Sequence, residues 1–147
     1  MNLIDALLGE HAMLYELFEL LEKTDPAAAG ADPARGVIAA LGKALLSHAH
    51  MEDELLFPAL EARIGPMGPL AVMRAEHREI ESALQEALKA ADASEALSRA
   101  RSALGVAREH FMKEEQVLFP MARRALESEE LSRLGERWAA LRRVAFE

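Results

Sequence analysis

A pattern that occurs twice constrains the fold of this chain more than any other sequence feature. A segment that begins with His-x3-Glu and ends with Leu-Phe-Pro occupies residues 48–58 and returns 62 positions later, at residues 110–120. The dipeptide Glu-His also occurs at residues 10–11 and again at residues 76–77. Two helices joined by a short connection form a recurrent unit, the helical hairpin. The chain therefore reads as two copies of one helical hairpin.

Apolar residues at steps of three and four predict five helices. Alanine, leucine and glutamate, all good helix formers, are abundant, and no stretch alternates in the manner of a strand. We expect helices at about residues 2–23, 33–59, 70–88, 93–121 and 128–146. The predicted fold class is all-α. It is an up-down-up-down four-helix bundle over about residues 2–126, with an additional C-terminal helix at its outside or end, in a single domain of residues 1–147.

Capping residues and helix breakers mark the boundaries of these helices. Residues 24–32 and 65–69 are rich in proline and glycine and read as connections. Pro58 is expected to kink or end the second helix. The predicted N-terminal caps are Asn2 with Asp5, Asp32 before Pro33, Asp92 with Glu95, and Ser128.

Four histidines interrupt the apolar stripes, one on each helix of the predicted bundle, and a glutamate follows two of them four residues later. Residues i and i+4 of a helix are neighbours, so each His-x3-Glu pair directs an imidazole and a carboxylate to the same part of the core. A lone histidine there is most often a hydrogen-bonded core residue. Two unpaired buried carboxylates, however, are costly against a total stability of about 5–15 kcal/mol, and bound cations remove that cost. The predicted metal ligands are His11, His48, Glu52, His77, His110 and Glu114.

The ligand types narrow the choice of metal. Imidazole with carboxylate suits iron, with manganese or zinc as substitutes, and the chain has no cysteine for a thiolate site. One tetrahedral zinc would use three or four ligands rather than six. Six ligands suit two ions, each held by two histidines, with Glu52 and Glu114 bridging them at about 3.5–4 Å or less. The Glu-x-x-His pattern of ferritin-like diiron proteins is absent from the sequence.

At these residues the sequence resembles the hemerythrin-like family, which is the HHE cation-binding domain. The resemblance covers residues 2 to about 124. It implies a non-haem diiron centre in a four-helix bundle, with two iron ions joined by an oxo or hydroxo bridge. In the family, this centre handles dioxygen, nitric oxide or peroxide, or responds to iron. The matching residues are His11, His48-x3-Glu52, His77 and His110-x3-Glu114-Glu115, with Leu-Phe-Pro after both pairs.

The chain departs from the oxygen carriers of that family at one position. Those proteins carry a further histidine four residues before the third-helix histidine, where this chain has Met73. We therefore expect turnover or sensing rather than reversible oxygen carriage. Glu81, four residues after His77, is either a replacement ligand or a solvated side chain. Tyr15, four residues after His11, is either a hydrogen-bond donor to a bound oxygen species or a boundary aromatic residue.

A rival His-x3-Glu pair is present at His50 and Glu54. The repeat, aligned on its prolines, selects His48 rather than His50. His50 also lies about 200° around the helix from His48, away from the apolar stripe. We expect His50 at the surface.

Charge and hydropathy limit the partners. The formal net charge of −8 argues against nucleic acid, whose binding requires a basic surface. No apolar run approaches the roughly 18 residues of a membrane span, and the first residues lack the features of a signal peptide, so we expect a cytoplasmic protein without membrane contact. The C-terminal helix presents either a solvated arginine face or a homodimer contact through Leu134, Trp138 and Leu141.

Three functions are compatible with this sequence. The first is a diiron protein that binds or reduces a small diatomic or peroxide ligand, with or without turnover. The second is an iron-responsive or gas-responsive sensor or interaction module. The third is iron storage or delivery.

Overall fold

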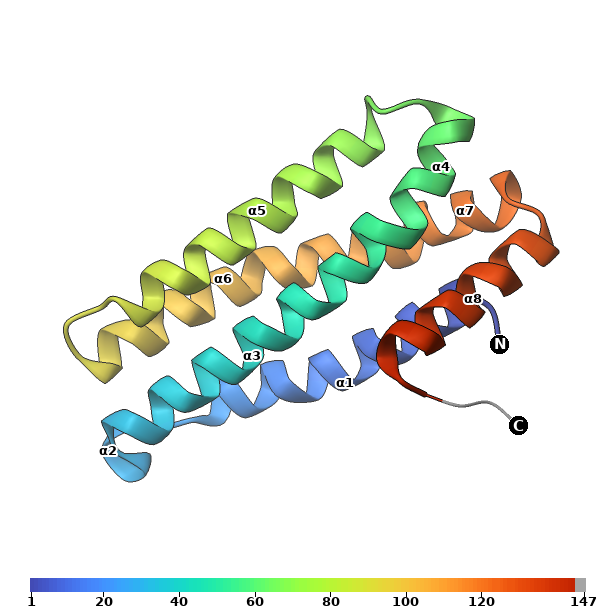
Figure 1. Cartoon of the computed structure of the whole chain (residues 1–147). Helices are drawn as coiled ribbons and strands as arrows, with labels where there is room; N and C mark the ends of the chain where they lie inside the picture. The colour runs from blue at the N-terminus through green and yellow to red at the C-terminus, as the bar shows by residue number, and fades with distance from the viewer. Residues whose placement is uncertain (145–147) are drawn as a thin grey trace.

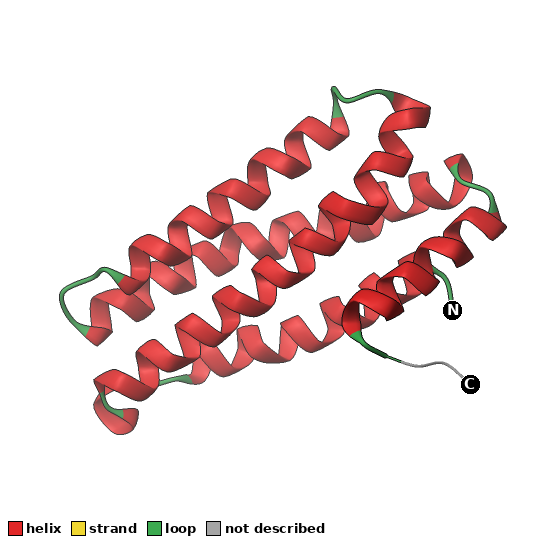
Figure 2. Ribbon diagram, viewed as in Figure 1, coloured by secondary structure: helices red, strands yellow, loops and turns green. Residues whose placement is uncertain are grey.

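The computed structural model describes residues 1–144, and these residues form helices and connections without a strand. Four helical rods run up and down in turn, and a further helix lies outside them (Figures 1 and 2). The all-α, up-down-up-down bundle with an additional C-terminal helix is therefore confirmed. The four rods are α1 (Leu3–Lys23), α3–η1–α4 (Ala31–Met51, Glu52–Leu56 and Phe57–Ile64), α5 (Pro69–Leu88) and α6–η2–α7 (Ala93–Lys113, Glu114–Leu118 and Phe119–Ala125). The remaining helices are α2 (Pro26–Ala29) and α8 (Ser128–Arg142).

Two of the predicted N-terminal caps hold. The Asn2 side chain accepts a bond from the Asp5 amide at 3.1 Å, and the Asp5 carboxylate accepts one from the Asn2 amide at 3.4 Å. This reciprocal pair is the capping box predicted for α1. The Asp92 side chain accepts from the Glu95 amide at 2.8 Å and caps α6.

Three other predicted boundaries are wrong. Residues 24–32 are not a plain loop, because they contain the one-turn helix α2. Helix α3 begins at Ala31, with Gly30 as its cap at φ 88°, so Asp32 lies inside the first turn, where it still favours the positive end of the helix dipole. Ser128 is the first residue of α8 rather than its cap, because the bond from the Leu131 amide to the Glu127 carbonyl starts the helix one residue earlier.

Pro58 neither ends the second helix nor leaves it a regular α-helix. Proline has no amide hydrogen and crowds the carbonyl four residues before it. The preceding residues, Glu52–Leu56, widen into a π-helical turn in which the Phe57 amide donates to the Glu52 carbonyl. The same turn, Glu114–Leu118, precedes the second proline of the repeat. Each π-turn begins at the glutamate of a His-x3-Glu pair, and such turns are frequent at functional sites.

The bundle interior consists of two apolar clusters. One contains Phe18, Leu41 and Leu84 and fills the end near α2. The other contains Leu7 and Phe57 and fills the end near α4, α7 and α8. Along each rod, the predicted metal ligands fall between residues of the two clusters. They therefore form a polar layer across the middle of the bundle, which we call the central layer.

Helix α8 packs alongside α1 (Figure 1). Leu134 is buried and Trp138 packs against the same apolar cluster, whereas Leu141 is exposed, so two of the three residues of the predicted dimer contact face their own bundle. Gly135 permits the close approach, since a Cβ atom there would lie 2.8 Å from the Met1 carbonyl oxygen. Ala145, which was predicted on this helix, lies outside the described residues. No helix in residues 1–144 is long and apolar enough to cross a membrane.

Candidate metal centre

The four rods bring all six predicted ligands together in the central layer. Each rod contributes one histidine, and the two glutamates stand at the first positions of η1 and η2. Both glutamates are fully buried, His11, His48 and His110 are nearly so, and His77 keeps 9% of its side chain exposed. The ligand atoms form two overlapping groups, within each of which all atoms lie within 4.8 Å of one another. The groups are His11, His48, Glu52 and Glu114, the first subsite, and His77, His110, Glu52 and Glu114, the second subsite.

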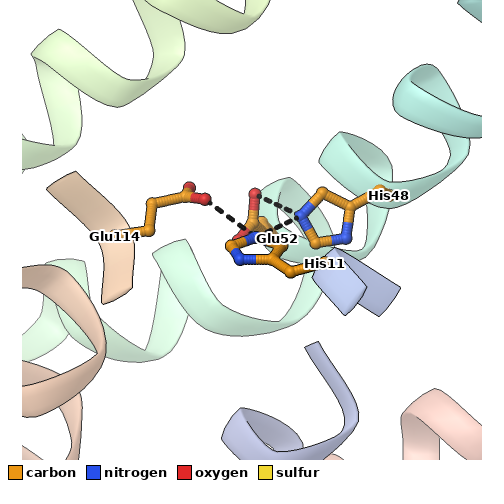
Figure 3. A group of neighbouring side chains, drawn as sticks. All are labelled: His11, His48, Glu52 and Glu114. Carbon is orange, nitrogen blue, oxygen red and sulfur yellow. Dashed lines mark hydrogen bonds and ion pairs between the residues drawn. The ribbon is translucent and has the colours of Figure 1, made fainter. Parts of the chain in front are cut away.

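In the first subsite, the imidazoles of α1 and α3 converge (Figure 3). His11 Nε2 lies 3.1 Å from His48 Nε2. His11 Nε2 also lies 3.2 Å from Glu114 Oε2, and His48 Nε2 lies 3.6 Å from Glu52 Oε2. Two nitrogens and two carboxylates therefore face one point.

The second subsite repeats this arrangement with α5 and α6. His77 Nε2 lies 3.0 Å from His110 Nε2. His110 Nε2 lies 3.0 Å from Glu114 Oε1, and His77 Nε2 lies 3.2 Å from Glu52 Oε2. Each glutamate thus faces one histidine of either subsite, which is the arrangement that bridging ligands require.

The outer nitrogen of each histidine faces a second carboxylate. His48 Nδ1 donates to Glu10 at 2.7 Å, and His110 Nδ1 donates to Glu76 at 2.8 Å. Partners of this kind orient a metal-binding imidazole and raise its basicity. The remaining two pairs are His11 Nδ1 with Glu115 at 2.8 Å and His77 Nδ1 with Asp53 at 3.6 Å, the latter an ion-pair distance without a hydrogen bond.

Sequence reasoning did not identify these four acids as partners, although a signal was present. Each acid is the immediate chain neighbour of a predicted ligand. It serves a histidine on another helix rather than its own neighbour: Glu10 precedes His11 but holds His48. Pairs of adjacent polar residues, one on the inner stripe and one beside it, are the sequence signal for this second set.

The donor chemistry of the central layer fits a pair of cations. When Nδ1 donates to a carboxylate, the neutral imidazole presents a lone pair at Nε2. The lone pairs of His11 and His48, 3.1 Å apart, then repel unless a positive charge lies between them. Within residues 1–144, the carboxylates of Glu52 and Glu114 receive no hydrogen bond. Buried charges without partners are costly, and two bound cations would satisfy all six side chains.

Protons take part of this role when no metal is bound. Burial raises the pKa of Glu52, and the adjacent Glu114 carboxylate raises it further. Burial opposes the charged form of His77, but the carboxylates of Asp53 and Glu52 outweigh burial and raise the pKa of His77 to about 10. The pKa of Glu114 is lowered, since the neighbouring histidines His11 and His110 outweigh its burial.

The other residues considered from the sequence lie outside this ligand set. Met73 is buried in an apolar cluster. Glu81 accepts a hydrogen bond from Gln85 at 3.2 Å and belongs to neither subsite. The Tyr15 hydroxyl donates to Glu115 at 3.2 Å, so it contacts the partner of His11. The rival pair formed by His50 and Glu54 is exposed, with 59% and 50% of the two side chains accessible.

A groove between α3 and α5 reaches the central layer from the surface. Its volume is about 740 Å³. His48, His77 and His110 lie at its inner end, and Leu45 and Leu84 line its apolar part. We call this cavity the α3/α5 groove. It gives a molecule from solution a route to the second subsite.

Helix α8 holds one of the outer carboxylates. Glu10 Oε1 accepts hydrogen bonds from Trp138 Nε1 at 2.8 Å and from Arg142 Nε at 2.6 Å, while Glu10 Oε2 accepts from His48. The equivalent acid of the second subsite, Glu76, pairs instead with the half-exposed Lys113 of α6. The two subsites therefore share a ligand set but differ in what supports it.

Comparisons with known proteins agree with this geometry. The family model of the hemerythrin HHE cation binding domain matches residues 2–122. The fold is similar to the crystal structure of a hemerythrin HHE cation binding domain-containing protein from Mycobacterium kansasii. The TM-score is 0.79 and the identity 25%, over 96% of this chain and 85% of that chain. A search among curated proteins gave no match. With the family model covering most of the chain, this protein belongs to the hemerythrin HHE cation-binding domain family.

Proposed function

We propose that this protein is a non-haem diiron protein that binds or reacts with a small oxidant: dioxygen, nitric oxide or peroxide. The observation that carries the proposal is the position of Glu52 and Glu114, each of which faces a histidine of both subsites. A carboxylate shared in this way suits two ions side by side better than one. Two iron ions held there would supply electrons and open coordination positions for a diatomic or peroxide ligand.

The residues of the chain have separate tasks in this proposal. The four histidines would provide neutral nitrogen ligands, and the two glutamates would bridge and contribute two negative charges. Glu10, Glu76 and Glu115 hold three of the imidazoles in the orientation that points Nε2 inward. With two histidines and two shared carboxylates, each subsite offers four protein donors, fewer than iron accepts.

The surroundings of the centre support reaction with a molecule from solution. The α3/α5 groove opens at the second subsite, and its apolar lining around Leu45, Ile80 and Leu84 would exclude bulk water. On the opposite side, Tyr15 and Glu115 keep a hydrogen bond next to His11. Burial and the Glu115 carboxylate raise the pKa of Tyr15 to about 12, so the phenol keeps its proton at neutral pH.

A sensor or interaction module is the alternative, and one observation favours it. Glu10 joins the metal ligand His48 to Trp138 and Arg142 of α8, the helix on the outside of the bundle. A change at the first subsite would therefore reach the surface through a single carboxylate.

Metal content per chain tests the proposed function. The protein would be purified without chelator, reconstituted anaerobically with ferrous iron and examined by elemental analysis. We expect about two irons per chain in the wild type and in His50→Ala, the exposed-histidine control, and clearly fewer in His77→Ala. Absorbance after exposure to dioxygen, nitric oxide or hydrogen peroxide then identifies the reactive oxidant. Failure of wild-type protein to take up iron would overturn the proposal.

A further inference from the structure

The α3/α5 groove arises from a difference between the two repeats. Positions of α3 correspond to positions 62 residues later in α6, as the repeated segments at 48–58 and 110–120 show. Positions of α1 correspond to positions 66 residues later in α5, as the Glu-His pairs at 10–11 and 76–77 show. The interface between α3 and α5 therefore has a counterpart between α6 and α1.

Large side chains occupy the counterpart interface. Phe111 and Phe18 are buried there, with ring centroids 5.5 Å apart. The Phe111 ring stacks on the His11 imidazole at a centroid distance of 3.8 Å and an angle of 6°. Tyr15 packs against Phe111 at 5.6 Å. On this side, His11 is therefore covered by aromatic rings.

Smaller side chains stand at the matching positions of the groove. Ala49 corresponds to Phe111, Leu84 to Phe18, and Gly42 to Leu104. All three smaller residues line the groove, and so does His77, the counterpart of His11. The interface between α3 and α5 therefore leaves open, beside a predicted metal ligand, the space that the interface between α6 and α1 fills.

The size of the groove exceeds what a two-atom ligand needs. Sites for small organic molecules occupy about 300–1,000 Å³ and are mostly apolar with a few polar groups, and the α3/α5 groove has about 740 Å³. Leu45, Ile80 and Leu84 line its apolar part, and its ionic lining residues are Lys43, Asp53, Arg74, Arg78 and Glu81.

Two of the cations on the lining are not neutralised by the protein. Among residues 1–144, no carboxylate lies within ion-pairing distance of Lys43 or Arg78, whereas the neighbouring Arg74 pairs with Glu61 at 2.7 Å. Of the acids on the lining, Asp53 faces His77, and Glu81 accepts a hydrogen bond from the neutral amide of Gln85 and lies beyond ion-pairing distance of both cations. In a chain with a formal net charge of −8, two free cations beside an apolar groove favour an anion.

We propose that the α3/α5 groove binds an organic carboxylate with an apolar body. The apolar body lies along Leu45, Ile80 and Leu84, and the carboxylate pairs with the Arg78 guanidinium, with Lys43 adding positive potential. The ligand then lies beside the second subsite. The inference rests on the proposed function only for the role of that neighbour, because the groove itself is made by side chains alone.

Calorimetric titration with sodium octanoate tests this proposal, on the metal-free protein and on the iron-loaded protein under anaerobic conditions. We expect saturable binding of one octanoate per chain, and weaker binding of 1-octanol, which has the same body without the charge. Ala49→Phe restores the side chain found in the other repeat and is expected to weaken octanoate binding by more than about tenfold. Arg78→Gln, at an exposed position, is expected to weaken it by about threefold.

The control is Arg137→Gln, which removes the same charge from the exposed face of α8 and is expected to bind octanoate as the wild type does. Absence of saturable binding to the wild type would overturn the proposal. So would unchanged binding to Ala49→Phe that has wild-type helical content, or equal weakening by Arg78→Gln and Arg137→Gln. Iron content measured on the same samples separates the two proposals. Octanoate binding can be absent while two irons bind per chain, and octanoate can bind while iron does not.

Discussion

The two metal subsites use the same side chains in the same order but differ in their surroundings. In the first subsite, Glu10 is held by two donors from α8, and His11 is covered by Phe111. In the second subsite, His77 faces the α3/α5 groove, and its outer partner Asp53 stands 3.6 Å away with 45% of its side chain exposed. Repetition of a hairpin therefore supplies the ligand set, while unrepeated contacts decide how firmly each half is held and how open it is.

We expect the largest effect from replacing Glu52 or Glu114, the two carboxylates that both subsites share. Replacing either bridging glutamate, Glu52→Leu or Glu114→Leu, should abolish tight binding of both metals, because each carboxylate faces both subsites. In the metal-free protein, Glu52→Leu should raise the free energy of unfolding by about 1–3 kcal/mol, because it removes a buried carboxyl group whose pKa is raised and which receives no hydrogen bond. Glu114→Leu should lower it by about 3–5 kcal/mol, because the neighbouring histidines favour the charged Glu114 carboxylate and lose that partner. Elemental analysis and urea unfolding measure the two effects. Loss of only one metal in either variant would contradict the sharing.

Removal of one histidine from each half should separate the subsites. We expect His77→Ala to keep about one metal per chain at the first subsite, and His48→Ala to keep less, because the first subsite has the firmer outer partners. In the wild type, a chelator should accordingly remove one metal faster than the other. Chelator-exchange kinetics followed by elemental analysis test this order. A single exchange rate for both metals would contradict the predicted difference between the subsites.

The hydrogen bonds from α8 to Glu10 should contribute more to metal affinity than the ion pair between Lys113 and Glu76. Loss of the partner that orients a metal-binding histidine typically lowers metal affinity by about 10–100-fold. We expect Arg142→Gln to lower the affinity of the first subsite by about tenfold, and Lys113→Gln, at a half-exposed side chain, to change the second subsite by only about twofold. Competition with a chelator of known affinity measures both, and Arg137→Gln is the control. Equal effects would mean that α8 does not position His48 through Glu10.

As pH rises, the stability of the metal-free protein and its affinity for metal should change in opposite directions. The pKa of His77 is raised to about 10 in the folded protein, above its ordinary value of 6.5. Its protonated form therefore stabilises the metal-free fold fully below pH 6.5, and this stabilisation is lost as pH rises toward 10. Metal affinity should rise over the same interval, because the metal displaces that proton. Urea unfolding and metal titration at pH 6 to 10 test both trends, and His77→Ala should flatten the stability curve of the metal-free protein.

We expect the smallest effect on stability from the N-terminal caps of the helices that begin the two repeats. Asn2 caps α1 with its side chain, whereas Gly68, 66 residues later, begins α5 without a side-chain cap. We expect Asn2→Ala to lower the free energy of unfolding by about 1 kcal/mol without changing metal content. Ser128→Ala should change it very little, because Ser128 does not cap α8. Thermal or urea unfolding of the metal-free variants decides this.

Periodicity predicted the fold and the convergence of the six inner side chains. An apolar stripe fixes which face of each helix points inward, so a histidine on the stripe must reach the core. His50 was assigned to the surface by the same reasoning, and it is exposed in the structure. Where every helix of a bundle carries one inward ligand, the bundle itself brings the ligands together.

Periodicity could not predict which acids pair with the outer nitrogens of these histidines. Glu10 and Glu76 lie beside the stripe, and which histidine each one meets depends on how neighbouring helices are rotated and spaced. The π-turns were missed because Pro58 was interpreted as a kink or an end, although a widened turn accommodates it. The groove depends on differences at Ala49 and Gly42 that leave the hydrophobic pattern unchanged.

The attachment of α8 to Glu10 has a consequence for the order in which the protein is made. All six inner residues precede α8 in the chain, so a ribosome delivers them before Trp138 and Arg142. A nascent bundle would have its histidines and glutamates in place while Glu10 still lacked both donors from α8. The first subsite would then mature only when the last described helix docks, which delays firm metal capture until synthesis has passed the bundle.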